Sequence, residues 1–160
     1  MAIRTIRTEK DEILYKKSRE VKEITPRIQE LVEDMFETMY EAEGVGLAAV
    51  QVGILKRLFV IDVDDEQLVF INPVIIKEEG EQIDVEGCLS FPGIRGNVTR
   101  PEKVVVKAYD LDFNEFELEA EGLLARAISH EYDHLEGNVF VDKINGDILS
   151  SYNKGEEEEE

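Results

Sequence analysis

The sequence has few of the features that mark secreted and membrane-embedded proteins. Its single cysteine, Cys88, cannot form an internal disulfide, which favours a reducing compartment. No apolar run approaches the roughly 20 residues that a membrane-spanning helix needs. Residues 1–5 have neither the apolar stretch nor the small-residue cleavage site of a signal peptide. The sequence therefore predicts a soluble cytoplasmic protein.

Basic residues are also scarce. The chain has 18 Lys and Arg against 37 Asp and Glu, which gives a net charge of −19. Such a chain is a poor candidate for holding DNA or RNA by neutralising phosphates, and an anionic membrane surface repels it. We therefore expect no direct nucleic acid binding and no membrane partner. With 160 residues, 42% of them hydrophobic, the chain can form the core of one domain.

Two helices are predicted. Apolar residues recur at three- and four-residue spacing over 26–43, which describes one face of a helix. Thr25 can cap this helix, and Gly44 can end it in the left-handed conformation. A second helix is predicted over 122–136, with Gly137 as its stop.

The other patterned segments predict strands and an α+β fold. Runs rich in Val, Ile and Phe, or alternating between apolar and acidic residues, lie at 57–63, 68–77, 82–85, 103–109, 115–121 and 139–141. Pro73 predicts an edge position or a break in pairing. Helices and mostly antiparallel strands without regular alternation indicate an α+β fold. We expect one domain over 1–145 and a disordered acidic tail over 146–160, which lacks an apolar period.

The only two histidines of the chain lie four residues apart, in the pattern H-E-x-x-H on the second predicted helix. Positions i and i+4 share one helical face, so His130 and His134 can bind one metal ion. Glu131 can then reach a metal-bound water as a general base without being a ligand. The alternative is a pair of helical histidines that holds no metal. The spacing and the adjacent glutamate favour the metal site.

A catalytic site of this kind uses three protein ligands, so one more is needed. No other histidine exists, and the many carboxylates offer no single candidate. Cys88 is a better candidate, and Gly87 beside it permits close backbone approach. A lone cysteine is ordinarily a small buried apolar residue. The histidine pair makes the ligand role the favoured interpretation here.

A third segment, Gly-Val-Gly-Leu-Ala-Ala-Val-Gln at 44–51, directly follows the first predicted helix. Its glycines permit tight backbone geometry and its alanines permit close packing. The segment matches neither a phosphate-binding loop nor a dinucleotide-binding pattern. Gln51 is its only polar side chain, and its amide N–H can be donated to a developing oxyanion.

Together, the three segments resemble peptide deformylase. The family is marked by G-x-G-L-A-A-x-Q, by E-G-C-L-S, and by H-E-x-x-H followed by L-x-G, and this chain has them in that order at 44–51, 86–90 and 130–137. The resemblance covers about residues 1–145, the predicted catalytic domain. It implies small antiparallel sheets packed around a central metal-binding helix. It also implies removal of the formyl group from the N-terminal formylmethionine of new polypeptides, which releases formate.

The resemblance also implies a role for individual residues. The metal ligands are Cys88, His130 and His134, the acid/base is Glu131, and the oxyanion is stabilised by Gln51 and the backbone N–H of Leu89. Substrate binding falls to Val45, Gly46, Gly87, Leu123 and Ala127. The sequence departs from the family pattern at Ser129, where Gln is usual, at Val50, where Pro is common, and at 8–12, which lack a Gly-Asp-Pro.

Metal and partner expectations follow from the same resemblance. It implies one Fe²⁺ per chain, with Ni²⁺ or Co²⁺ as active substitutes, whereas affinity for nitrogen and sulfur ligands alone favours Zn²⁺. The expected substrates are N-formylmethionyl nascent peptides. The protein is expected to be a bacterial monomer that associates transiently with the ribosome. Two alternatives are a zinc endopeptidase of the H-E-x-x-H type, which usually has a third His or Glu ligand, and an inactive metal-binding module, which has no use for Glu131.

Overall fold

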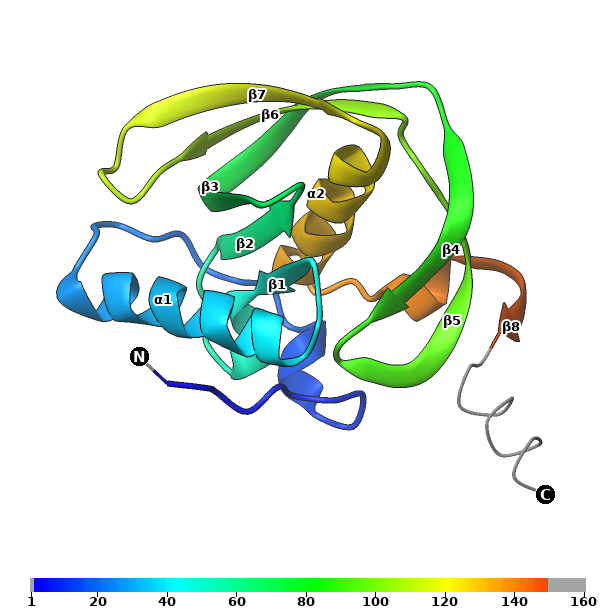
Figure 1. Cartoon of the computed structure of the whole chain (residues 1–160), viewed down its shortest axis with the longest axis horizontal. Helices are drawn as coiled ribbons and strands as arrows, with labels where there is room; N and C mark the ends of the chain where they lie inside the picture. Colours follow the sequence, from blue (N-terminus) through cyan, green and yellow to red (C-terminus); the bar gives the residue numbers. More distant parts are fainter. Residues whose placement is uncertain (1, 150–160) are drawn as a thin grey trace.

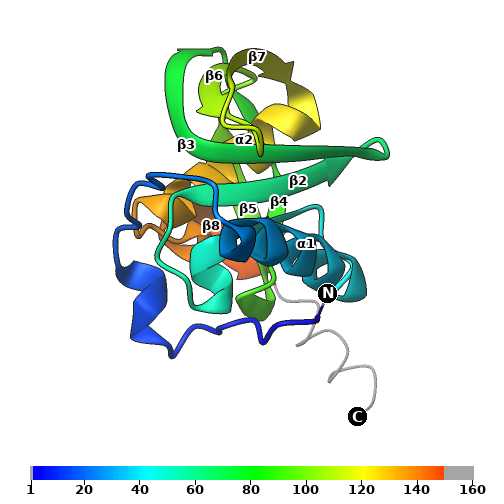
Figure 2. The same cartoon turned by 90° about the vertical axis from the view of Figure 1, so that its left-hand side faces the viewer.

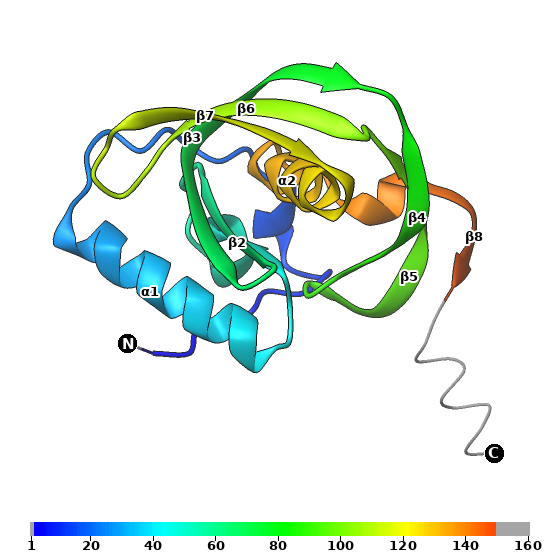
Figure 3. The same cartoon turned by 45° about the horizontal axis from the view of Figure 1, so that its top comes forward.

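The structure, a computed structural model that describes residues 2–149, places one central helix between two antiparallel sheets (Figure 1). This helix, α2 (Gly122–Leu135), is seen nearly end-on in Figure 3, with strands on both sides of it. The predicted α+β fold with small antiparallel sheets around a central helix is therefore confirmed. None of the helices within the described range is both long and apolar enough to cross a bilayer.

The larger sheet has five strands in the order β1-β2-β3-β6-β7, and every neighbouring pair is antiparallel. The strands are β1 (Gly46–Ala48), β2 (Leu58–Val63), β3 (Glu66–Glu79), β6 (Lys103–Tyr109) and β7 (Glu115–Glu121). The register of β3 shifts between Ile71 and Val74. The predicted break in pairing at Pro73 is therefore confirmed, although β3 lies inside the sheet.

Alternation along β2 gives this sheet two buried faces. Leu58 and Val60 pack with the apolar side of α1 (Pro26–Glu41), whereas Phe59 and Ile61 pack with α2. Successive side chains of a strand point to opposite faces, so one strand contributes to both clusters. In Figure 2, α1 lies below β2 and runs in roughly the same direction as β2 and β3. The position of α2 is thus set by apolar packing against the larger sheet.

The smaller sheet has three strands in the order β4-β5-β8. Its strands are β4 (Gln82–Cys88), β5 (Phe91–Arg100) and β8 (Ile144–Leu149). A separate apolar cluster beneath it contains Phe91, Val98 and Phe140. Short 3-10 helices complete the fold: η1 (Glu12–Tyr15), η2 (Ala49–Val52) and η3 (Phe140–Lys143).

The C-terminal part of the domain differs from the sequence prediction in two places. The strand expected at 139–141 is wrong, because this segment leads into the 3-10 helix η3 and buries Phe140 instead. The tail expected to be unstructured from residue 146 is wrong for 146–149, because β8 pairs with β5 there. This pairing joins segments that are distant in the sequence. The residues of β8 have no apolar periodicity of their own from which the strand could have been predicted. The remainder of the predicted tail lies outside the described residues.

The helix ends follow the sequence except at Gly44. The Thr25 side chain accepts a hydrogen bond from the Ile28 amide at 3.2 Å, as predicted for a cap. The left-handed residue after α1 is Glu43, with φ of 59°, so the assignment of that conformation to Gly44 was wrong. Gly44 is needed for a close approach, because a Cβ there would lie 2.7 Å from Leu89 Cδ1. Gly137, with φ of 78°, follows α2 as predicted.

Candidate active site

The structure brings the three predicted metal ligands together. One ligand atom from each of Cys88, His130 and His134 lies within 4.8 Å of the others. The Cys88 Sγ atom lies 3.3 Å from His134 Nε2. Both histidines are on the buried face of α2, and Cys88 ends β4 at a shift in strand register. Segments 42 residues or more apart in the sequence therefore converge on one point.

Glu86 orients one of these histidines. Its Oε2 lies 2.6 Å from His130 Nδ1, which leaves Nε2 as the ring nitrogen of His130 that can bind a metal. Sequence reasoning assigned no role to Glu86. A signal was present, because residues 86 and 88 are two apart on a strand and so share a face with each other. Glu86, which orients His130, and Cys88, the predicted thiolate ligand, therefore both belong to β4.

Two buried arginines hold Glu86 in turn. Arg100 donates from Nε to Oε1 at 3.1 Å and from Nη2 to Oε2 at 2.6 Å. Arg126 donates from Nη1 to Oε1 at 2.8 Å. Burial would raise the pKa of Glu86, but the contacts with His130 and Arg100 outweigh burial and lower it well below the ordinary range. Glu86 is therefore an anion, and sequence analysis identified neither arginine.

The buried donor set fits a metal ion. A thiolate and two imidazoles are ligands that zinc and other divalent transition metals prefer, and three protein ligands leave a coordination position for water. Burial lowers the pKa of His134, which keeps this imidazole neutral and able to bind a metal. The Glu131 Oε1 atom is also buried and has no hydrogen-bond partner among the described residues. An unpaired buried acceptor beside the three ligands suits a bound water.

Glu131 lies against the backbone of β1. A Cβ added at Gly46 would be 2.7 Å from Glu131 Oε2, so only glycine leaves room for this carboxylate. The Glu131 side chain is buried, and burial raises its pKa to about 7 in the metal-free protein. A carboxyl group that titrates near neutral pH can both accept and return a proton.

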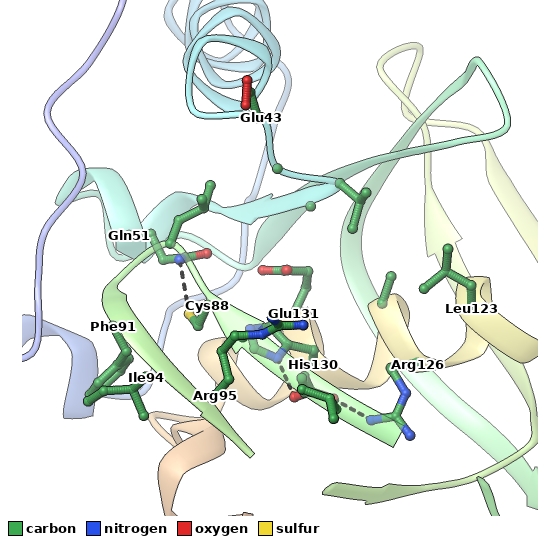
Figure 4. A pocket seen from close by; sticks show the side chains of 18 of the residues that line it. Glu43, Gln51, Cys88, Phe91, Ile94, Arg95, Leu123, Arg126, His130 and Glu131 are labelled. Carbon is green, nitrogen blue, oxygen red and sulfur yellow. Dashed lines mark hydrogen bonds and ion pairs between the residues drawn. The ribbon is translucent and has the colours of Figure 1, made fainter. Parts of the chain in front are cut away.

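Gln51 is held on the opposite side of the site by its own neighbours. Its Oε1 accepts a hydrogen bond from the Ala48 amide at 2.9 Å, and its Nε2 donates to Ser90 Oγ at 3.0 Å. The same Nε2 lies 3.6 Å from Cys88 Sγ (Figure 4). These contacts fix the orientation of the amide, and its Nε2 faces Cys88 of the ligand set. The amide of Leu89 follows Cys88 directly along the chain.

A cavity of about 530 Å³ opens over these groups. All five residues that the sequence predicts for substrate binding line it, and they are Val45, Gly46, Gly87, Leu123 and Ala127. Gly87 is not needed for space, because a Cβ there would meet its neighbours at an ordinary 3.7 Å. Arg95 and Arg126 also line the cavity and were missed (Figure 4). The wall therefore combines apolar side chains with two cations.

Strands with a free edge border this cavity on two sides. β1 pairs only with β2, and β4 pairs only with β5, among the strands that are described. Residues of β1 and β4 both line the cavity, from different sheets. Free strand edges present unpaired N–H and C=O groups that an extended peptide can use.

Two of the three departures from the family pattern, at Val50 and Ser129, lie outside the ligand set. Val50 is fully buried in the apolar cluster between the larger sheet and α2. Ser129 is also buried, and its hydroxyl has no hydrogen-bond partner within residues 2–149. Neither residue lines the cavity over the metal ligands.

The fold and the site together define a metal-dependent hydrolase with its ligand helix held between two sheets. Comparison with known proteins identifies the family, because the pattern of polypeptide deformylase matches residues 3–148. The chain belongs to the polypeptide deformylase family. The predicted enzyme class, peptide deformylase, is confirmed, and the alternative of a zinc endopeptidase gains no support.

Individual relatives cover nearly the whole chain. Peptide deformylase of Lachnoclostridium phytofermentans is 55% identical over 163 residues, covering 99% of this chain and 100% of the relative. Peptide deformylase 1 of Clostridium perfringens is 60% identical over 144 residues, covering 89% and 98%. The crystal structure of peptide deformylase from Thermotoga maritima superposes with a TM-score of 0.88 at 39% identity, covering 89% of this chain and 98% of that one.

Proposed function

We propose that this chain hydrolyses the formamide bond of N-terminal formylmethionine in newly made polypeptides and releases formate. The observation that carries the proposal is the position of Glu131. Its buried carboxylate lies beside the Cys88, His130 and His134 cluster and faces a cavity lined by Val45 and by Gly46 of β1. A buried base beside a metal-ligand set is the arrangement that hydrolysis needs.

Cys88, His130 and His134 would hold one divalent ion. When bound, the ion supplies positive charge that acidifies water and polarises the formyl oxygen. We further propose Fe²⁺ as the working ion in the cell, with Ni²⁺, Co²⁺ or Zn²⁺ able to occupy the same ligands. The family resemblance supports iron, whereas affinity alone would favour zinc.

The residues of the chain account for the proton transfers and for charge stabilisation. Glu131 takes a proton from the attacking water, whose oxygen bonds to the formyl carbon. Negative charge then grows on the formyl oxygen, where the Gln51 Nε2–H and the Leu89 amide donate hydrogen bonds. The carbon–nitrogen bond breaks, Glu131 returns the proton to the leaving amine, and formate is released. Formyl is the smallest acyl group, so a tight site excludes larger ones.

The substrate is proposed to bind as an extended N-terminal peptide. Its methionine side chain enters the cavity between Leu123 and Ala127, and its backbone pairs with the free edges of β1 and β4. We propose that the enzyme acts as a monomer on nascent chains in the bacterial cytoplasm, in transient association with the ribosome. The single cysteine and the bacterial relatives support this setting.

The test measures formate release from formyl-Met-Ala-Ser, acetate release from acetyl-Met-Ala-Ser and peptide-bond cleavage in an unformylated protein, all at equal concentration. Formyl-Met-Ala-Ser should be hydrolysed, whereas acetyl-Met-Ala-Ser and an unformylated protein should not be cleaved. Cleavage of internal peptide bonds in the protein would support an endopeptidase instead. Failure of the metal-loaded chain to release formate from the formylated peptide would overturn the proposal.

A further inference from the structure

Arg126 joins the cavity wall to the residue that holds a metal ligand. It lies four positions before His130, so the two side chains share one face of α2. Its side chain is 7% exposed and lines the cavity. Its Nη1 donates to Glu86 Oε1 at 2.8 Å, and its Nη2 donates to the Val98 carbonyl at 2.9 Å and reaches the Gln82 carbonyl at 3.4 Å. One guanidinium therefore binds α2 to both β4 and β5.

The two carboxylate oxygens of Glu86 have different hydrogen-bond partners. Oε2 receives His130 Nδ1 and Arg100 Nη2, both at 2.6 Å. Oε1 receives Arg126 at 2.8 Å and the more distant Arg100 Nε at 3.1 Å. Removing Arg126 would take the shorter donor from Oε1 and leave that oxygen under-satisfied in a buried site. The carboxylate could then rotate away from the geometry that holds the His130 ring.

We infer that Arg126 is a positioning residue of the metal centre, which acts through Glu86 to orient His130. The inference rests on the metal centre of the proposed function. Arg100 cannot replace Arg126, because its Nη1 is engaged by Asp133 at 2.6 Å. The same side chain forms part of the cavity wall, so the orientation of a metal ligand and the shape of the cavity depend on one residue.

A merely structural role would predict different behaviour. If Arg126 only attached α2 to the smaller sheet, another substitution that weakens the packing of α2 to a similar extent would have the same effect on metal binding. Ile128→Val provides that control, because Ile128 is fully buried on α2 in the apolar cluster with the larger sheet. Arg126→Met keeps an unbranched side chain in the wall but removes the donors, and Arg126→Lys keeps a positive charge.

The experiment measures Co²⁺ affinity by competition with a chelator, together with the visible spectrum of the Co²⁺-loaded protein. Losing a direct hydrogen-bond partner of a ligand usually costs about 10- to 100-fold in affinity. Because Arg126 acts one contact farther out, Arg126→Met should bind Co²⁺ about tenfold more weakly and should alter the ligand-field bands. Arg126→Lys should recover part of the affinity. In a Glu86→Gln background, Arg126→Met should change the affinity by less than about threefold, because the residue through which it acts is already altered.

Three results would overturn the inference. These are wild-type affinity and spectrum in Arg126→Met, an equal loss of affinity in Ile128→Val, and an undiminished effect in the Glu86→Gln background. If Arg126→Met does not fold, Arg126→Gln is measured in its place under the same criteria. Failure of the wild-type chain itself to bind Co²⁺ would instead overturn the metal centre, so the two failures are distinguishable.

Discussion

Gly46→Ala tests whether the position of the Glu131 carboxylate controls turnover. The new Cβ would lie 2.7 Å from Glu131 Oε2 and 3.2 Å from its Cδ and Cγ atoms. The closest of these distances is about 0.7 Å short of an ordinary 3.4 Å contact, so the carboxylate must move. Gly46 does not have a positive φ, so alanine adds no backbone strain there. The nearest contacts of the new methyl group are therefore with the base, and because Gly46 also lines the cavity, any effect on substrate binding is read separately from KM.

The size of the effect follows from that displacement. A misplacement of about 1 Å in a catalytic group can cost about 100-fold in rate, so a shift of this size should lower kcat about 10- to 100-fold. This corresponds to about 1.4–2.7 kcal/mol of additional barrier. The three atoms nearest to the new methyl group all belong to Glu131 and none to a metal ligand, so bound metal should remain stoichiometric.

The assay measures kcat and KM for formyl-Met-Ala-Ser, and metal content is determined in the same preparation. The double variant Gly46→Ala/Glu131→Asp is the companion measurement, because a shorter acid relieves the clash without restoring the reach of glutamate. Wild-type kcat in Gly46→Ala would refute the reasoning. Loss of metal in proportion to activity would do so as well, because it would show that the substitution disturbs the ligands.

Three further predictions concern the ligands, the metal and the N-terminal segment. Cys88→Ala should lose tightly bound metal and activity together, and Cys88→Ser should not preserve both; full activity with stoichiometric metal in Cys88→Ala would exclude the ligand role. The Fe²⁺ form should be inactivated by air or peroxide while the Ni²⁺ form survives, and equal activity per metal for Zn²⁺ would refute the iron assignment. Burial would raise the pKa of Asp34, but the Ala2 amide and Arg4 lower it overall. The stabilisation that Asp34 provides should therefore be complete above its ordinary pKa and decline as the pH falls. The difference in free energy of unfolding between the wild-type chain and Asp34→Asn should become smaller from about pH 6 to about pH 3. A difference that does not change with pH would contradict this.

The parts of the site that sequence could predict are those that carry a pattern. The two histidines at i and i+4, the glutamate between them and a single cysteine are few enough to be picked out, and the structure brings His130, His134 and Cys88 together. Helix periodicity likewise gave α1 and α2 to within two residues. Strong local periodicity and scarce residue types can both be recognised in the sequence without knowledge of the contacts between distant segments.

The parts that sequence could not predict depend on distant pairing. Glu86, Arg100 and Arg126 are three of 55 charged residues, and nothing local marks them as a buried cluster. Their charges become informative only when β4, β5 and α2 are packed together. The strand β8 was missed for the same reason, because pairing with β5 organises a segment that has no apolar period of its own.

The most direct test of the account compares formate release per bound metal ion in the wild-type chain and Glu131→Gln. The amide has the size of the acid but cannot accept the proton. With formyl-Met-Ala-Ser as substrate, the account predicts stoichiometric metal in both proteins and a rate per metal that is about a hundredfold or more lower in Glu131→Gln. Equal rates per metal ion, or a loss of metal that accounts for the whole loss of activity, would contradict the role assigned to Glu131.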